Sequence, residues 1–240
     1  MIFLPSYLKL GLTAGEPLET PLPVILCLHG GGSNATVFNI QSLRIQRLLS
    51  NTFTFVFLDG PSVTSAGAGV IPTFQGCDPY FRWFKGDRDI NIMPSETRSQ
   101  VSRALTYINS EPELGSVVAF LGFSQGGKLG AGLLWEQMLK GPESGWDFKF
   151  GIICNAISPP MTEIRGEDEG KRVQIPTLHV VGLEDEWRES SRSLFGGFFD
   201  GAKSKKVEFG VGHRLPTAEN ETKDVADEIL RIWGEVKEGA

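Results

Sequence analysis

The sequence predicts one α/β domain built on a mainly parallel sheet with helices on its faces. Short apolar runs recur along the chain, and segments with apolar residues at helical spacing separate them. The length of 240 residues, with 40% hydrophobic content, suits a single core of this class. Because strands and helices alternate, we expect right-handed crossovers between parallel strands. We therefore treat residues 1–240 as one domain.

Five apolar runs have the composition of strands that are buried on both faces. None of them alternates polar and apolar residues, as a half-exposed strand would. They are Val24–Leu28, Phe53–Leu58, Val117–Leu121, Phe150–Cys154 and Leu178–Val181. A sixth segment, Lys205–Phe209, does alternate, which predicts a strand at the edge of the sheet.

Three further segments carry apolar residues at the spacing of a helix face. Their members are Val101, Leu105 and Ile108, then Leu129, Leu133 and Leu134, and finally Val225, Ile229, Ile232 and Val236. Residues three or four apart lie on one side of a helix, so each set predicts a helix that packs on the sheet.

Charge and cysteine content exclude several classes of protein. The chain has 29 acidic and 23 basic residues, so nothing favours binding to nucleic acid or to an anionic membrane. Its cysteines, Cys27, Cys77 and Cys154, are few, odd in number and far apart, which argues against a disulfide framework and against a structural zinc site. The start of the chain lacks the pattern of a signal peptide, and no apolar stretch is long enough to cross a bilayer. We expect a soluble cytoplasmic protein.

One long segment, residues 59–93, shows no clear period. It is rich in aromatic residues and lies between a predicted strand and a predicted helix. Connections of this length in a compact domain are usually active-site lids or binding loops. We therefore expect this segment to serve the functional site.

The strongest motif is Gly122–Gly126, which reads GFSQG. It follows the strand Val117–Leu121 directly and opens a predicted helix. A serine on such a sharp strand-to-helix turn projects its hydroxyl above the sheet, and the flanking glycines allow the turn. Ser124 is therefore the candidate nucleophile.

A serine nucleophile needs a base, and the chain has three histidines. His29 belongs to a glycine-rich stretch at the end of the first central strand. His179 lies inside an apolar strand, which predicts a buried core residue. His213 follows the last strand in a loop, and loops at the carboxyl ends of parallel strands form the active sites of open α/β sheets. We predict that His213 is the base.

The third catalytic residue should be a carboxylate between the serine and the histidine in chain order. Glu184, Asp185 and Glu186 follow the strand Leu178–Val181. The G-x-x-D spacing places Asp185 just beyond the turn, so we choose Asp185 to hold the imidazole and stabilise its charged form.

An acyl-transfer enzyme also needs N–H donors for the oxyanion. One is expected at Gln125, directly after the nucleophile. The other should come from the glycines after the first central strand, with Gly31 preferred and Gly32 second. The same glycines, followed by Ala35, also imitate a dinucleotide-binding fingerprint, but that interpretation leaves the serine, the acid and the late histidine unexplained.

These motifs together resemble the fungal serine hydrolase family of the α/β-hydrolase superfamily, over nearly the whole chain. The matching stretches read VILCLHGGGSN, FLDGP, FQGCDPYFRWF, GFSQGG, HVVGLEDEW and GVGHRLP. The resemblance implies an α/β-hydrolase fold, a triad of Ser124, Asp185 and His213, and an oxyanion hole at Gly31 and Gln125. The chain length leaves little room for a large separate cap domain. The family often has a bulky residue where Gly31 stands, so the glycine either widens the acyl pocket or shifts the oxyanion donor.

The resemblance also implies a substrate class. Members are carboxyl esterases or thioesterases, and some release a polyketide chain from the carrier domain of a synthase in secondary metabolism. Segment 59–93 would then cover the active site. Its residues Phe74, Tyr80, Phe81 and Trp83 either bind an extended acyl chain or only pin the loop to the sheet.

The expected reaction is hydrolysis through an acyl-serine, without a metal or an organic cofactor. Three alternatives stay open: transfer of the acyl group to an internal nucleophile with cyclisation, a general short-chain carboxylesterase, and a non-catalytic binding homologue. If a carrier domain is the partner, the basic run 203–206 is a candidate contact on an otherwise acidic chain.

Overall fold

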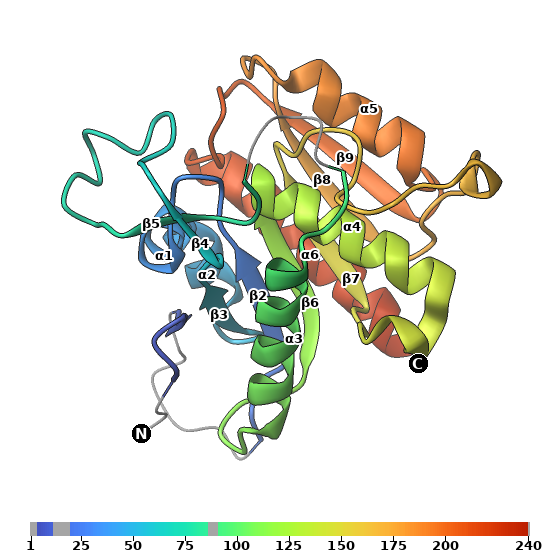
Figure 1. Ribbon diagram of the computed structural model, residues 1–240, viewed down its shortest axis with the longest axis horizontal. Helices are drawn as coiled ribbons and strands as arrows, with labels where there is room; N and C mark the ends of the chain where they lie inside the picture. The colour runs from blue at the N-terminus through green and yellow to red at the C-terminus, as the bar shows by residue number, and fades with distance from the viewer. Residues whose placement is uncertain (1–3, 12–19, 86–90, 240) are drawn as a thin grey trace.

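The computed structural model describes residues 4–11, 20–85 and 91–239. Within them, a central sheet has the strand order β1-β3-β2-β6-β7-β8-β9 (Figure 1). Its strands are β1 (Leu8–Leu10), β2 (Val24–Leu28), β3 (Thr54–Leu58), β6 (Val117–Phe123), β7 (Phe150–Cys154), β8 (Thr177–Gly182) and β9 (Ser204–Phe209). All neighbouring pairs are parallel except β1 with β3. The mainly parallel α/β sheet is confirmed.

Helices cover both faces of the sheet. They are α1 (Ala35–Gln41), α2 (Leu43–Leu49), α3 (Ser95–Ser110), α4 (Gln125–Lys140), α5 (Arg188–Phe198) and α6 (Glu219–Glu238), with short 3₁₀ turns at Gly141–Ser144 and Gly166–Asp168. In Figure 1, α3 and α4 lie in front of the sheet and α6 behind it. The two hydrophobic clusters agree, because one contains residues of α3, α4 and α5 and the other residues of α1, α2 and α6.

The alternation of side chains along each strand divides the core between these two faces. In β2, Val24, Leu26 and Leu28 pack in the cluster with α3, α4 and α5. Ile25 and Cys27 point the opposite way, into the cluster with α1, α2 and α6. All five residues are fully buried, which explains why this strand is a continuous apolar run.

One strand of the main sheet and three helices that pack on it were not predicted from the sequence. Strand β1 has only three residues and pairs at the edge, and α1 and α2 have seven residues each, too few for a clear apolar period. Helix α5 carries two buried residues, Ser191 and Leu194, of which one is polar. The predicted strand at 205–209 does lie at the edge of the sheet as β9.

The segment 59–93 is more ordered than expected. It contains a small antiparallel pair of strands, β4 (Ser62–Thr64) and β5 (Tyr80–Arg82), while residues 86–90 lie outside the described part. In Figure 1 the connection between β4 and β5, drawn in teal, reaches out beyond the edge of the main sheet near α1. The antiparallel pairing of β4 with β5 fixes the side-chain directions of β5.

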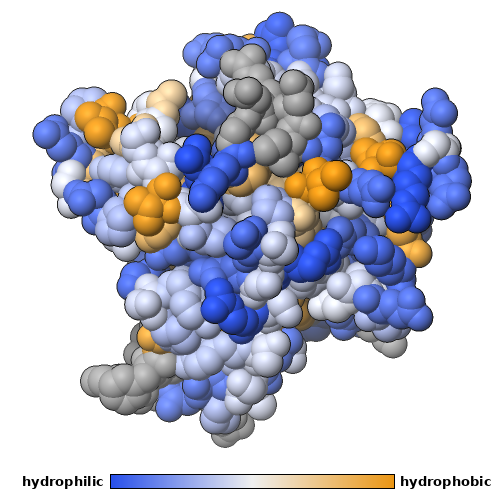
Figure 2. All heavy atoms as spheres, viewed as in Figure 1, coloured by the Kyte–Doolittle hydropathy of each residue, from blue (hydrophilic) through white to orange (hydrophobic). Residues whose placement is uncertain are grey.

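The surface in Figure 2 is mostly hydrophilic, with small separate groups of apolar side chains. The exposed large apolar residues of the described chain come from several elements, as in Ile40, Val63 and Ile164. None of the described helices is long and apolar enough to span a membrane.

Candidate active site

Ser124 occupies the sharp turn between β6 and α4. Its backbone has φ 52° and ψ −115°, a strained conformation for a residue with a side chain. The flanking glycines are needed for close packing: a Cβ on Gly122 would lie 2.5 Å from the carbonyl oxygen of Gly126, and one on Gly126 would lie 2.0 Å from that of Leu28. The turn therefore has the geometry of a nucleophile elbow.

The structure brings the three predicted triad residues together in one hydrogen-bonded chain. His213 Nε2 lies 2.9 Å from Ser124 Oγ, and His213 Nδ1 lies 2.7 Å from Asp185 Oδ2. The Asp185 side chain is fully buried, whereas that of His213 is 30% exposed. A buried carboxylate that accepts a hydrogen bond from Nδ1–H keeps the proton on Nδ1. Nε2 is then free to take the proton of the serine hydroxyl.

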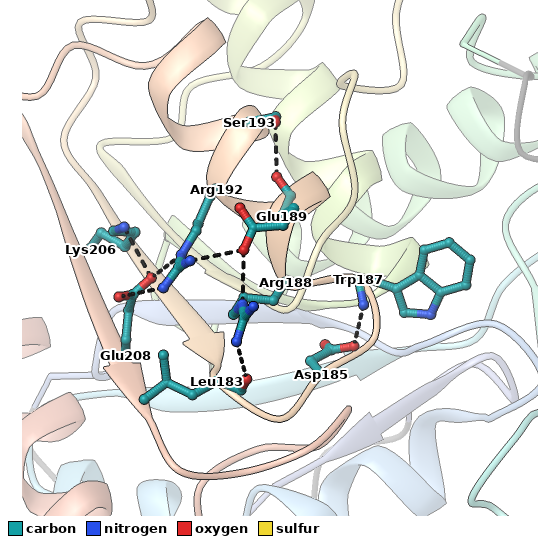
Figure 3. Close-up of polar contacts among 9 residues, drawn as sticks. All are labelled: Leu183, Asp185, Trp187, Arg188, Glu189, Arg192, Ser193, Lys206 and Glu208. Atoms are coloured by element: carbon teal, nitrogen blue, oxygen red, sulfur yellow. Dashed lines mark hydrogen bonds and ion pairs between the residues drawn. The ribbon is translucent and has the colours of Figure 1, made fainter.

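The second oxygen of Asp185 is also held. Trp187 N–H donates to Asp185 Oδ1 at 2.9 Å, at the point where the loop after β8 leads into α5 (Figure 3). Nearby, the guanidinium of Arg188 donates to the carbonyl oxygen of Leu183 at 2.7 Å, which closes the same loop. The carboxylate is thereby fixed from both sides before any substrate arrives.

Asn155, which sequence reasoning missed, joins the loops that carry the acid and the base. It follows β7 with φ 46°, and its Oδ1 accepts from Gly182 N–H at 2.8 Å. Its Nδ2 donates to the carbonyl oxygen of Arg214 at 3.0 Å, next to His213. A polar residue directly after a buried strand was the available signal, because such positions lie at the active edge of the sheet.

The predicted oxyanion donors Gly31 and Gln125 lie next to each other. A Cβ on Gly31 would come within 2.6 Å of Gln125 Cδ. The neighbouring Gly32 is committed elsewhere, because its N–H donates to the carbonyl oxygen of Phe81 at 2.9 Å. Gln125 is the first residue of α4, where backbone N–H groups have no acceptor within the helix. This geometry favours Gly31 over Gly32 as the second donor.

The other two histidines are buried and engaged. His29 Nδ1 lies 2.7 Å from the carbonyl oxygen of Gly30, and Gly60 N–H donates to His29 Nε2 at 2.9 Å. Burial lowers the pKa of His29 to about 4 and that of His179 to about 3. His179 is a buried core residue, as predicted, and neither ring reaches Ser124.

A cavity of about 920 Å³ opens beside Ser124 and His213. The connection between β4 and β5 forms one of its walls through residues 64–70, 73 and 74. Of the four aromatic residues predicted to bind substrate, Phe74 is the one that lines this cavity. The segment is tied to the glycine loop, since Gly67 N–H donates to the carbonyl oxygen of Gly32 at 2.8 Å.

Tyr80, Phe81 and Trp83 do not line the cavity, and their contacts pin the segment to the sheet instead. The Tyr80 hydroxyl donates to the carbonyl oxygen of Phe74 at 2.6 Å. Phe81 pairs with Ser33 and faces a separate cavity of about 1040 Å³. Trp83 is fully buried, and its indole N–H donates to the carbonyl oxygen of His29 at 2.7 Å.

Comparison with known proteins finds relatives over most of the chain. The chain is 33% identical to "Esterase FUS5" of Gibberella moniliformis over 212 residues, covering 88% of this chain and 87% of that protein. It is 32% identical to "Thioesterase FSL2" of Gibberella zeae, covering 88% and 93%. Among solved structures, acyl-protein thioesterase 2 of Zea mays matches the fold with a TM-score of 0.58 at 16% identity, over 94% of this chain and 98% of that one.

A protein-family model also matches most of the chain and shows the family to which it belongs. Residues 20–225 match the family described as serine hydrolase (FSH1), a range that contains every residue of the candidate site. The curated relatives are named esterases and thioesterases. The chain therefore belongs to the serine hydrolase (FSH1) family and is an enzyme of the esterase and thioesterase class with an α/β-hydrolase fold.

Proposed function

We propose that this enzyme cleaves an acyl thioester or ester through an acyl-Ser124 intermediate and releases a polyketide chain from the carrier domain of a synthase. The observation that carries the proposal is the hydrogen-bonded chain from Asp185 through His213 to Ser124 at the mouth of the 920 Å³ cavity. A curated relative named a thioesterase supports the thioester as the bond that is cleaved.

In the proposed mechanism, His213 Nε2 takes the proton of Ser124 Oγ as the oxygen attacks the acyl carbonyl. The N–H groups of Gly31 and Gln125 stabilise the oxyanion, and Asp185 stabilises the imidazolium. The imidazolium then protonates the leaving thiol or alcohol. Water, activated by His213 in the same way, releases the acid and restores the serine.

The exposure of His213 favours water over an internal nucleophile as the acyl acceptor. Its side chain is 30% exposed, so solvent reaches the base directly. An enzyme that cyclises its product must exclude water from the acyl-enzyme. We therefore favour hydrolysis over release of the product by cyclisation.

The basic run 203–206 contributes little to the proposed carrier contact. Lys205 pairs with Glu228 at 2.7 Å and Lys206 with Glu208 at 3.0 Å, so their charges are compensated. Both lysines lie at the start of β9, whereas Ser124 lies at the opposite, carboxyl end of the parallel strands. A carrier domain would approach the cavity mouth instead.

A cytoplasmic location is part of the same proposal. Cys27, Cys77 and Cys154 are free thiols, which is usual in a reducing compartment. Burial raises the pKa of Cys154 to about 12, so this thiol does not compete with Ser124 as a nucleophile.

The test compares matched acyl thioesters and oxygen esters, free and carrier-bound, with wild type and Ser124→Ala. We expect wild type to cleave thioesters faster than the matched oxygen esters, and carrier-bound chains faster than free thioesters, with loss of all activity in Ser124→Ala. Cleavage of oxygen esters alone would reduce the function to a carboxylesterase. Equal activity of wild type and Ser124→Ala would overturn the proposal.

A further inference from the structure

Arg82 lies on β5 and lines the catalytic cavity, whereas its aromatic neighbours Phe81 and Trp83 do not. Side chains alternate along a strand, so Phe81 faces the separate cavity and Arg82 faces the one that contains Ser124. The backbone on both sides of Arg82 is bonded to the catalytic loops. Phe81 N–H donates to the carbonyl oxygen of Ser33 at 2.7 Å, and Trp83 N–H to Gln125 Oε1 at 3.3 Å.

The guanidinium of Arg82 has no partner in the described part of the chain. Its Nε is buried and makes no hydrogen bond. Other arginines are paired with carboxylates: Arg98 with Glu136, Arg192 with Glu208 and Arg231 with Glu228. A buried donor without an acceptor lowers stability, so packing alone does not explain this residue.

The chemistry of the guanidinium indicates what would bind it. A guanidinium donates two parallel hydrogen bonds to a carboxylate or a phosphate. The other charged residues that line the cavity, Glu186 and Arg214, are exposed and carry opposite charges. Arg82 is therefore the partly buried cation of the cavity.

We infer that the Arg82 guanidinium binds an anionic oxygen group of the acyl substrate. The inference rests on the proposed function and specifies the substrate of the same site. The anion has two sources: a carboxylate on the acyl chain, or the phosphate of a phosphopantetheine leaving group. In either case the guanidinium orients the substrate relative to Ser124 without taking part in the bond changes.

The experiment uses two pairs of thioesters. In the first, octanoyl and suberyl chains on N-acetylcysteamine differ in a terminal carboxylate. In the second, octanoyl-pantetheine and octanoyl-phosphopantetheine differ in a phosphate. We expect wild type to prefer the charged member of at least one pair by roughly tenfold or more in kcat/KM. The pair that shows the preference identifies the source of the anion.

Two variants and a control assign the preference to the guanidinium. Arg82→Met should abolish the preference, measured in each protein as the ratio of kcat/KM for the charged and the neutral member of a pair, and Arg82→Lys, which keeps the charge but not the fork, should retain part of it. Arg47→Met removes an exposed arginine of α2 and should have no effect. Because Arg82 is unpaired, the melting temperature of Arg82→Met should be equal to or above that of wild type.

The outcomes separate this inference from the function on which it rests. If a fluorophosphonate labels Ser124 and both members of each pair react equally, the enzyme is a serine hydrolase and the role of Arg82 is refuted. A preference that survives in Arg82→Met refutes it as well. If Ser124 is not labelled and no substrate is cleaved, the proposed function fails, and the inference with it.

Discussion

The side chain of Gln125 occupies the space beside Gly31 in which any other residue would carry its Cβ. That Cβ would lie 2.6 Å from Gln125 Cδ and 2.7 Å from Nε2. The glycine therefore does not simply widen the acyl pocket, because Gln125 fills the volume. A larger residue at position 31 would have to displace the end of the Gln125 side chain, whose Oε1 accepts from Trp83 N–H at 3.3 Å.

Leucine at position 31 should displace the end of the Gln125 side chain, break its hydrogen bond with Trp83 N–H and disturb the loop that carries the Gly31 N–H. We expect Gly31→Leu to lower kcat by about a hundredfold, as small misplacements in active sites do. Adding Gln125→Ala should restore part of the loss by freeing the space. A double-mutant cycle on kcat/KM measures this coupling, and strictly additive losses would contradict the packing explanation.

Asp185→Asn should disable the base while keeping the fold. An amide in place of the carboxylate can still accept from Trp187 N–H, but it favours the wrong tautomer of His213. We expect kcat to fall by about 10⁴-fold with little change in melting temperature. Glu184→Gln, at an exposed neighbouring acid, should keep full activity. Full activity of Asp185→Asn together with loss of activity in Glu184→Gln would instead identify Glu184 as the acid of the triad.

Asn155 should position both arms of the triad. Asn155→Ala removes its hydrogen bonds to Gly182 and Arg214, which should lower kcat tenfold or more and the free energy of unfolding by about 1–3 kcal/mol. Asn155→Gly also removes them but relieves the strain at φ 46°. Loss of activity in both variants assigns the effect to the hydrogen bonds. Normal activity in the glycine variant alone would assign it to the backbone conformation.

Acid should destabilise the protein through its buried histidines. Burial lowers the pKa of His179 from 6.5 to about 3, so the unfolded chain binds more protons between these values. This contribution to stability is complete above pH 6.5 and is lost progressively as the pH falls towards 3. His179→Phe should make the free energy of unfolding depend less on pH, by roughly 2 kcal/mol between pH 7 and 4.5. Urea titrations at both values measure it, and an unchanged pH dependence would refute the assignment.

The sequence sufficed for the elements whose signals are local. The central strands β2, β3, β6, β7 and β8 are almost wholly buried and therefore appear as apolar runs, and the elbow at Ser124 needs glycines at fixed positions. The triad residues lie at or just after the carboxyl ends of strands. In a parallel sheet these ends lie at the same edge, so the topology predicts that the three residues come together. Helices α1 and α2 were missed because seven residues give no measurable period.

The cavity wall was harder to predict because it depends on strand pairing. The aromatic residues of 74–83 suggested a substrate surface, but the pairing of β5 with β4 buries Tyr80 and aims Phe81 at another cavity. Arg82, a charged residue among aromatics, faces the catalytic cavity instead. Which side of a strand faces a site is set by register, and a single sequence does not reveal that register.

The most direct measurement is the mass of the protein during turnover. Wild type and Ser124→Ala are mixed rapidly with an acyl thioester, quenched in acid and analysed as intact protein and as peptides. The account predicts one acyl group per chain on the peptide that contains Ser124 and none in the variant. An acyl group on another residue, such as the half-buried Cys77, or hydrolysis by Ser124→Ala at the rate of wild type, would contradict it.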